Sequence, residues 1–328
     1  MKSFIKRILF SLFQIEQNNG LIQLKLGSWV VFSFDLFDRY YKRYYKKLQD
    51  SNEYIIINAN FGEAYVVFKY FLPQLIAKNS DLLLILTKKK QIDLLKMFNI
   101  DCKYCLIENW IVDRMKGKFN YKNKKVWVLF NHDYYVSLEE KMKRSVSNYV
   151  TEMETFLGLK ANASDCAKIS VSQKVKDSVQ KKLELLHIKN NKFVFILPEA
   201  NTCSDFTVEE LDLVVQAVLK KGLKPVVNIF QRKEFYAVKG IKTCDLTVPE
   251  CFEIASLSVY VIGVKSGLLE ILSEAGKRTL VVAKPFKNRA PSEQMPVEAS
   301  LEGFSAKHLP LSFKVEEYLE FSQLDILK

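Results

Sequence analysis

The chain has 328 residues, which is long for one hydrophobic core and suits two domains of about 100–200 residues each. Hydrophobic residues make up 48% and charged residues 26%, a composition that excludes long disorder, collagen-like repeats and low-complexity sequence. Lysine and arginine number 49 against 37 aspartates and glutamates, so the formal charge is +12. Such a surface suits polyanions, including phosphorylated ligands and anionic membranes.

The sequence lacks the usual motifs of nucleic-acid-binding, metal-binding and membrane-spanning proteins. The sequence has no zinc-finger spacing, no RRM-like motif and no basic helix of the bZIP type, so we expect no nucleic-acid partner. Three histidines argue against a His-based metal centre, and the one CxxC pair, Cys102 and Cys105, has no second pair at zinc spacing. No run of 18 apolar residues occurs, and the apolar N-terminus lacks a cleavage site, so we expect a cytoplasmic protein.

Residues 1–50 stand apart, with nine basic and four acidic side chains and eight aromatic residues between Trp29 and Tyr45. Five hydrophobic residues recur at helical spacing and predict one aromatic face: Phe34, Phe37, Tyr41, Tyr44 and Leu48. The basic residues fall largely elsewhere on that helix: Arg39, Lys42, Arg43, Lys46 and Lys47. This basic aromatic helical extension either packs on the next domain or lies against a membrane, and the sequence leaves both alternatives open.

Residues 51–165 alternate between apolar strands and amphipathic helices. We expect strands at 54–59, 82–87, 104–107 and 126–130. We expect helices at 63–78, bent near Pro73, at 92–98, and at 138–157, where Gly158 ends the helix. This order predicts a doubly wound, Rossmann-like domain with a parallel sheet.

The alternation restarts after a linker at residues 166–190, in which Ser172 can cap a helix. The segment 191–328 has expected strands at 193–197, 225–230, 259–263 and 279–283. Thr207 and Glu210 have the spacing of a capping box at the start of a helix. The tail ends in an expected helix at 315–321, which could pack back on the N-terminal domain. Two such α/β domains place a ligand site at the carboxyl ends of their strands.

The second half resembles the heptosyltransferase-type (family 9-like) glycosyltransferases of bacterial lipopolysaccharide synthesis, which have the GT-B architecture. Residues 169–173 match the start of the family's linker helix, and 197–201 stand where it has an Asn-Pro-Gly-like turn. Residues 246–267 match its Leu-x-Glu-Leu-Ala helix, the next strand and an Asp-Ser/Thr-Gly-x-x-His motif. In the first half, 57–63 looks like its first strand and Gly-Asp turn. The resemblance implies two Rossmann-like domains facing across a cleft, the first binding the acceptor and the second the nucleotide-sugar.

The sequence departs from this family at the donor motif. Lys265 stands where the family has aspartate, and Glu270 stands where it has histidine. The family's lysine before its Trp-Pro pair falls near Ser204 or Asp205 and is absent. These departures imply a donor other than ADP-heptose. The resulting Ser-Gly-x-x-Glu pattern is similar to that of other GT-B enzymes and of UDP-sugar epimerases, where the glutamate binds the nucleotide's ribose.

The donor-site candidates follow strands of the C-terminal domain. Gly267 opens a helix after a strand, so its N–H groups could hold a diphosphate, with Lys265 adding positive charge and Glu270 accepting the ribose hydroxyls. The remaining candidates, for phosphate or base contacts, are Ser266, Pro198, Asn201, Thr202 and Arg232. An ordinary capped helix and plain turns would give the same patterns, so both interpretations stay open here.

The catalytic candidates follow strands of the N-terminal domain. An inverting transfer needs a carboxylate that takes the proton of the acceptor hydroxyl, and Glu63 follows the first strand. His132 and Asp133 follow the strand at 126–130 and could bind the acceptor or assist the base. A helix-start glutamate and a structural histidine are the alternatives. No Asp-x-Asp motif occurs, so we expect no metal or other cofactor.

The resemblance thus implies a metal-independent glycosyltransferase of the hexosyl- or heptosyltransferase class. It would move a sugar from a nucleotide-sugar to a bacterial surface glycan, such as lipopolysaccharide or capsule, on a lipid-linked acceptor. Residues 1–50 would then hold a peripheral protein at the inner face of the membrane. The alternatives are a nucleotide-sugar epimerase of the same fold and a non-catalytic, degenerate transferase that acts as a partner protein.

Overall fold

The computed structural model describes the chain in separate ranges, and for residues 14–34 it describes the backbone only. The ranges are residues 14–18, 21–26, 29–48, 51–108, 112, 115, 117–130, 149–162, 165–287 and 315–318. They fall into two compact units. The first comprises Met1–Ala59, Leu75–Ile92 and Asp101–Asn131, and the second Asn60–Gln74, Asp93–Ile100 and His132–Lys328. These limits differ from the predicted domains 51–165 and 191–328, so the predicted boundaries stay a prediction.

The first unit begins with an antiparallel sheet. Strands β1 (Gln14–Asn18), β2 (Leu21–Leu26) and β3 (Trp29–Asp35) pair in that order, and helix α2 (Leu36–Leu48) follows directly. The predicted helical extension is therefore correct for α2 and wrong for β1, β2 and β3, while residues 1–13 lie outside the described residues. Phe34 lies in β3 and does not belong to the helical face. The β-branched and aromatic residues of Trp29–Phe34 favour a strand, and pairing with β2 overrides the helical spacing.

The aromatic face of α2 is packed inside the first unit. Phe37 is fully buried, and its ring centroid lies 5.5 Å from that of Phe119 and 5.1 Å from that of Tyr121, both at edge-to-face angles. The ring of Tyr54, on the strand that follows α2 in the chain, has its centroid 6.0 Å from that of Phe37. Of the two alternatives for the predicted aromatic face, packing on the domain holds for Phe37 and Leu48, while Tyr41 and Tyr44 are partly exposed.

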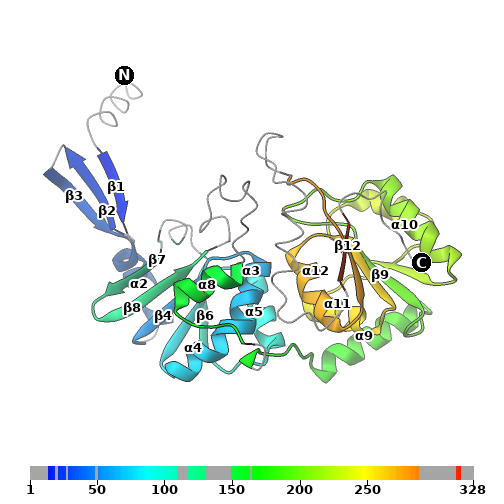
Figure 1. Cartoon of the computed structure of the whole chain (residues 1–328), viewed down its shortest axis with the longest axis horizontal. Helices are drawn as coiled ribbons and strands as arrows, with labels where there is room; N and C mark the ends of the chain where they lie inside the picture. Colours follow the sequence, from blue (N-terminus) through cyan, green and yellow to red (C-terminus); the bar gives the residue numbers. More distant parts are fainter. Residues whose placement is uncertain are drawn as a thin grey trace, which may run out of the picture. The chain divides into compact units, whose positions relative to one another are not determined.

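The second sheet of the first unit has five strands in the order β6-β5-β4-β8-β7 (Figure 1). The strands are β4 (Glu53–Ile57), β5 (Leu82–Leu86), β6 (Lys103–Leu106), β7 (Gly117–Tyr121) and β8 (Lys124–Leu129), and α5 (Lys89–Met97) follows β5. All pairs are parallel except the β7–β8 hairpin. Its turn residues, Lys122 and Asn123, both have positive φ, as a tight hairpin requires. The sequence analysis missed β7.

The helix that follows β4 changes its geometry in the middle. It runs as α3 (Phe61–Val66), a π-helical segment η1 (Val67–Phe71) and α4 (Leu72–Lys78). Pro73 has no N–H, so the carbonyl of Lys69, four residues earlier, lacks its usual helical donor. The backbone N–H of Ala167 donates to that carbonyl at 2.9 Å instead. The bend predicted near Pro73 is thus a π-helical segment on which the linker segment docks.

The second unit contains a six-stranded parallel sheet in the order β11-β10-β9-β12-β13-β14. Its strands are β9 (Phe193–Leu197), β10 (Lys224–Val227), β11 (Lys242–Thr243), β12 (Tyr260–Val264), β13 (Arg278–Val282) and β14 (Val315–Tyr318). Its helices include α8 (Tyr149–Leu157), α9 (Gln173–Leu185), α10 (Val208–Lys220), η4 (Lys233–Ala237), α11 (Val248–Leu257), α12 (Gly267–Leu272) and η5 (Ser273–Ala275). Figure 1 shows α10 on one side of the strands and α11 and α12 on the other, which is the predicted doubly wound arrangement.

Helix ends in this unit follow the sequence signals. Gly158 has a φ of +66° and its N–H bonds the carbonyl of Glu154 at 2.8 Å, so it ends α8 as predicted. Thr207 and Glu210 form the predicted capping box of α10. The predicted terminal helix at 315–321 is wrong over Val315–Tyr318, which is strand β14. There the carboxylate of Glu316 pairs with Arg278 of β13 through two contacts of 2.6 Å, which hold the strand at the sheet edge.

One buried carboxylate joins the linker helix to α11. Glu250 accepts hydrogen bonds from the Ser178 hydroxyl at 2.7 Å and the Thr247 backbone N–H at 2.8 Å, and it pairs with Lys182 at 2.9 Å. Burial by itself would raise the pKa of Glu250, but these hydrogen bonds outweigh it and lower the pKa to about 2. The charged form is therefore built into the packing of α9 against α11.

Replacing Glu250 with glutamine should lower the free energy of unfolding by about 1–3 kcal/mol at neutral pH, because a charged hydrogen-bond acceptor is lost. The folded-state pKa is lowered, so this stabilisation is complete above the ordinary pKa of 4.5 and disappears as the pH falls toward 2. Urea unfolding from pH 7 to pH 2 measures the difference between wild type and E250Q. Glu253→Gln, on the same helix, is the control. A difference that does not shrink in acid would contradict the assignment.

Candidate functional site

The predicted donor-site residues lie at the carboxyl ends of neighbouring strands in the second unit. Pro198, Asn201 and Thr202 follow β9, Arg232 follows β10, and Lys265 to Glu270 follow β12. Because β10, β9 and β12 are adjacent and parallel, their loops emerge at one edge of the sheet. This is the edge at which open α/β sheets bind ligands, so the placement agrees with the prediction, while the role of each residue stays a prediction.

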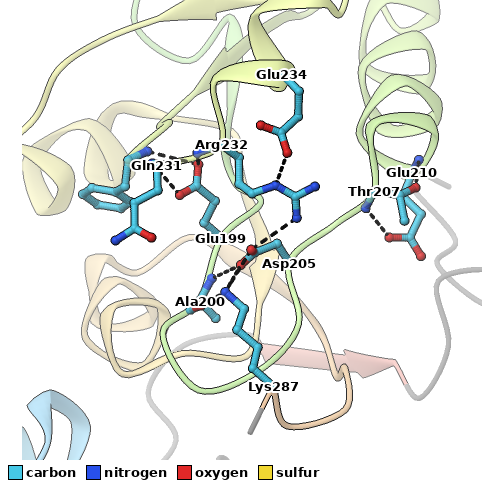
Figure 2. Close-up of polar contacts among 10 residues, drawn as sticks. Glu199, Ala200, Asp205, Thr207, Glu210, Gln231, Arg232, Glu234 and Lys287 are labelled. Carbon is cyan, nitrogen blue, oxygen red and sulfur yellow. Dashed lines mark hydrogen bonds and ion pairs between the residues drawn. The ribbon is translucent and has the colours of Figure 1, made fainter.

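Asp205 ties the loops that follow β9 and β10 to the loop that follows β13 (Figure 2). Its carboxylate accepts from the backbone N–H of Ala200 at 2.9 Å, from Lys287 at 2.8 and 2.9 Å, and from Arg232 at 3.4 Å. Lys287 also donates to the carbonyl of Ala200 at 2.7 Å. The Asp205 side chain is only 7% exposed, so its charge is stabilised by these partners rather than by water. The β9, β10 and β13 loops are thereby held in one arrangement.

Glu199 also holds the β10 loop, through the backbone of that loop. Its carboxylate accepts from three consecutive backbone N–H groups, those of Phe230, Gln231 and Arg232, at 3.1, 2.8 and 3.2 Å (Figure 2). Successive N–H groups that converge in this way form an anion-binding concavity. In this protein the chain's own carboxylate fills it. Arg232 also contacts Glu234, so this arginine lies between two carboxylates of the chain.

Two glycines bring the starts of α3 and α12 together within the second unit. A Cβ atom on Gly267 would lie 2.6 Å from the backbone nitrogen of Gly62, and one on Gly62 would lie 2.2 Å from the Glu270 carboxylate. Neither position has room for a side chain. Ser266 caps α12 by accepting from the N–H of Leu269 at 3.2 Å, and Glu270 is buried at 3% exposure. Glu270 therefore faces the start of α3 and is not a solvated surface carboxylate.

A buried polar cluster lies further along the same helices. Lys69, on the π-helical segment, pairs with Glu274 at 2.5 Å and donates to the Tyr65 hydroxyl at 3.1 Å. The Tyr65 hydroxyl also donates to Glu274. The two ionisable side chains are 9% and 12% exposed. Burial raises the pKa of Glu274 and lowers the pKa of Lys69, because both charged forms lose solvation.

The predicted catalytic residues are only partly described. Glu63 lies in the first turn of α3, next to Gly62, and is partly exposed. Asn60 precedes it at the N-cap position with no side-chain capping bond. His132 and Asp133 lie outside the described residues. Glu63 thus directly follows Gly62, which packs against Gly267 and Glu270 of α12.

Metal-binding clusters and membrane-spanning helices are both absent from the described residues. No group of three or more His, Cys, Asp or Glu side chains there could hold a metal ion. Within the same ranges, no helix combines the length and apolar character needed to cross a membrane.

Comparison with known proteins identifies the fold. No family model matches the sequence, and no curated protein matches it. Among solved structures, the glycosyl transferase family 9 protein from Veillonella parvula aligns over 83% of this chain and 88% of its own, with a TM-score of 0.52 and 10% identity. The fold is that of a family 9 glycosyltransferase.

Two other solved structures align with lower scores. The Escherichia coli ADP-heptose lipopolysaccharide heptosyltransferase II covers 81% of this chain and 90% of its own, with a TM-score of 0.48 and 9% identity. A UDP-GlcNAc 2-epimerase from Neisseria meningitidis covers 77% and 86%, with a TM-score of 0.36 and 14% identity. The fold that this chain shares with the Veillonella parvula protein confirms the predicted α/β class.

Sequence analysis missed the residues that hold this site together. Asp205, Lys287 and Glu274 were not among the candidates, since each partner lies far away in the sequence. Lys69 carried a local signal, because it follows Tyr65 by four residues and so shares its helix face. Glu274 likewise follows Glu270 by four residues. Only the packed structure shows that these pairs meet.

Lys69→Met should lower the free energy of unfolding by about 3–5 kcal/mol, because it leaves the Glu274 carboxylate buried without its cation. The pKa of the orphaned carboxyl is raised, so the variant should lose further stability as the pH rises from acid to mildly alkaline values. Chemical denaturation across that pH range tests this expectation. The double variant K69M/E274Q should recover most of the loss.

The matched control is Lys103→Met, which breaks the exposed pair with Asp81, where the Lys103 and Asp81 side chains are 53% and 35% exposed. Its expected effect is below about 1 kcal/mol. Equal losses in K69M and K103M, or a double variant no better than K69M, would contradict the buried-pair interpretation.

Proposed function

We propose that the protein is a glycosyltransferase that moves a sugar from a nucleotide-sugar donor to a bacterial surface glycan. The observation that carries the proposal is the gathering of polar loops at the carboxyl ends of β9, β10 and β12, on a family 9 fold. The solved relatives include a heptosyltransferase that acts with ADP-heptose, as its name states. Lipopolysaccharide or a similar glycan is therefore the acceptor class that we propose.

The donor nucleotide would lie along the β9 and β12 loops. Gly267 allows close approach of a ligand or of backbone at the start of α12, and Lys265, half-exposed beside it, supplies positive charge. Glu270 would accept the ribose hydroxyls if the Gly62 backbone moves aside, since its carboxylate now faces that residue. Lys265 and Glu270 replace the aspartate and histidine of the resembling family, so we propose a donor other than ADP-heptose.

Glu63 is the proposed base. Its carboxylate would take the proton from the acceptor hydroxyl as the sugar transfers with inversion. Helix α3 presents this residue one position after Gly62, which touches the start of α12. We propose that no metal takes part and that basic side chains and backbone N–H groups stabilise the leaving diphosphate.

A second candidate, a non-catalytic partner protein, has one observation in its favour. Arg232 of the β10 loop and Lys287 of the β13 loop are already paired within the chain, since Arg232 contacts Asp205 and Glu234, and Lys287 contacts Asp205. The N–H groups of residues 230–232 are likewise occupied by Glu199. A donor diphosphate would have to bind beside these pairs or replace them.

A thermal-shift screen against UDP, GDP, CDP, ADP and CMP, with and without magnesium, separates the two candidates. A ligand that binds the native state raises the unfolding midpoint by mass action. We expect a rise with one nucleoside diphosphate that does not depend on magnesium. No rise with any of the five would favour the non-catalytic candidate.

Glu63→Gln should leave nucleotide binding intact and lower the transfer rate by about 10²–10⁴-fold, because the general base is lost. The measurement is single-turnover sugar transfer with the donor identified by the screen. Glu253→Gln, the same chemical change on α11, is the control and should keep the wild-type rate. Full activity in E63Q would show that another group takes the proton.

A further inference from the structure

Helix α2 carries a group of basic side chains. Arg39, Lys42 and Arg43 are spaced at i, i+3 and i+4 and share one side of the helix, and Lys46 follows a kink of the helix at Tyr44. All four are exposed, and Lys47 is exposed beside them. We call these five side chains the basic face of α2.

Packing of the opposite side fixes the orientation of this face. Phe37, Tyr40 and Leu48 are fully buried, and the rings of Phe37 and Tyr41 contact the β7 strand through Phe119 and Tyr121. The helix cannot roll without exposing these aromatic rings to water. The basic face therefore points outward as a fixed feature of the first unit.

The β7–β8 turn extends the positive charge. Lys122 lies 3.8 Å from Asp38, and Lys42 pairs with the same carboxylate at 2.7 Å, so the two lysines are neighbours. Their side chains are 67% and 70% exposed. Asp38 is the only acidic residue within α2, and hydrogen bonds from Lys42 and the Tyr121 hydroxyl keep its pKa low. Two carboxylates, Asp38 in α2 and Asp35 directly before it, thus stand against six cations.

We propose that this face docks on a membrane surface rich in anionic phospholipid. A group of exposed basic side chains can meet several headgroups at once, and each cation near such a surface adds to the attraction. Tyr45, 59% exposed, adjoins the group. An amphipathic tyrosine ring is suited to the depth of lipid headgroups. These features favour a lipid surface over a nucleic acid.

The mode of binding differs from that of an inserted amphipathic helix. Phe37 and Tyr40, which could otherwise enter the acyl region, are buried in the protein, and Tyr41 and Tyr44 are partly buried. Attachment would therefore be electrostatic, with little apolar insertion, and it would be screened by salt. This inference concerns a binding surface of the first unit and does not depend on the proposed transfer activity.

The test is co-sedimentation of the full chain with vesicles of phosphatidylcholine alone and of phosphatidylcholine with about one-third phosphatidylglycerol. We expect binding to the anionic vesicles only, lost at about 1 M salt, where the Debye length is about 3 Å. The triple variant R43Q/K46Q/K47Q should bind roughly 100-fold more weakly, since each cation contributes about fivefold.

A matched variant removes the same charge from exposed lysines of α9 in the second unit, K174Q/K176Q/K181Q, and should bind as wild type does. Thermal melts establish that both variants are folded. Equal weakening in the two triples, or no binding of the wild type to anionic vesicles, would overturn the proposal. So would tighter binding to an oligonucleotide that depends on Arg43, Lys46 and Lys47, because the face would then serve nucleic acid.

Discussion

The packing of α3 against α12 in the second unit depends on two glycines, Gly62 and Gly267, which have no side chain. Gly62 and Gly267 let the backbone of α3 meet the start of α12, with less space than one methyl group needs. This contact sets the register of the two helices against each other. Tyr65 and Lys69 then reach Glu274, and the Glu270 carboxylate lies at the start of α3. Glu63, the proposed base, takes its position from the same contact.

Carboxylates at the edge of this sheet serve largely as anchors. Glu199 holds the N–H groups of the β10 loop, Asp205 joins three loops, and Glu250 joins the linker helix to α11. Each is stabilised by several donors, and removing a donor would leave a poorly solvated charge. Rigid loops favour ligand binding because less conformational entropy is lost when the ligand binds. The same ion pairs, however, occupy cations that could otherwise bind a diphosphate. This balance makes nucleotide binding the decisive property of the site.

In the first unit, helix α2 has an aromatic side that packs against the sheet and a basic side that faces solvent. The aromatic residues contribute to the core, and the basic residues remain in solvent. The helical spacing of residues 37–48 predicts both faces, but it does not say what covers the aromatic one. Strand β7 covers it, through Phe119 and Tyr121. Because that strand was not predicted, the choice between a core and a membrane stayed open until the structure was known.

Local patterns in the sequence determined the α/β class and most strands of the five-stranded and six-stranded sheets. They also determined the capping box at Thr207 and the end of α8 at Gly158. These features depend on hydrophobic period and on backbone chemistry within a few residues. Tertiary structure alone decided that β1, β2, β3 and β14 are strands, since a strand's partner supplies its hydrogen bonds. It also decided the pairing of Lys69 with Glu274 and of Asp205 with Lys287. Those partners are far apart in the chain, and only the packed fold brings their charges together and removes the water around them.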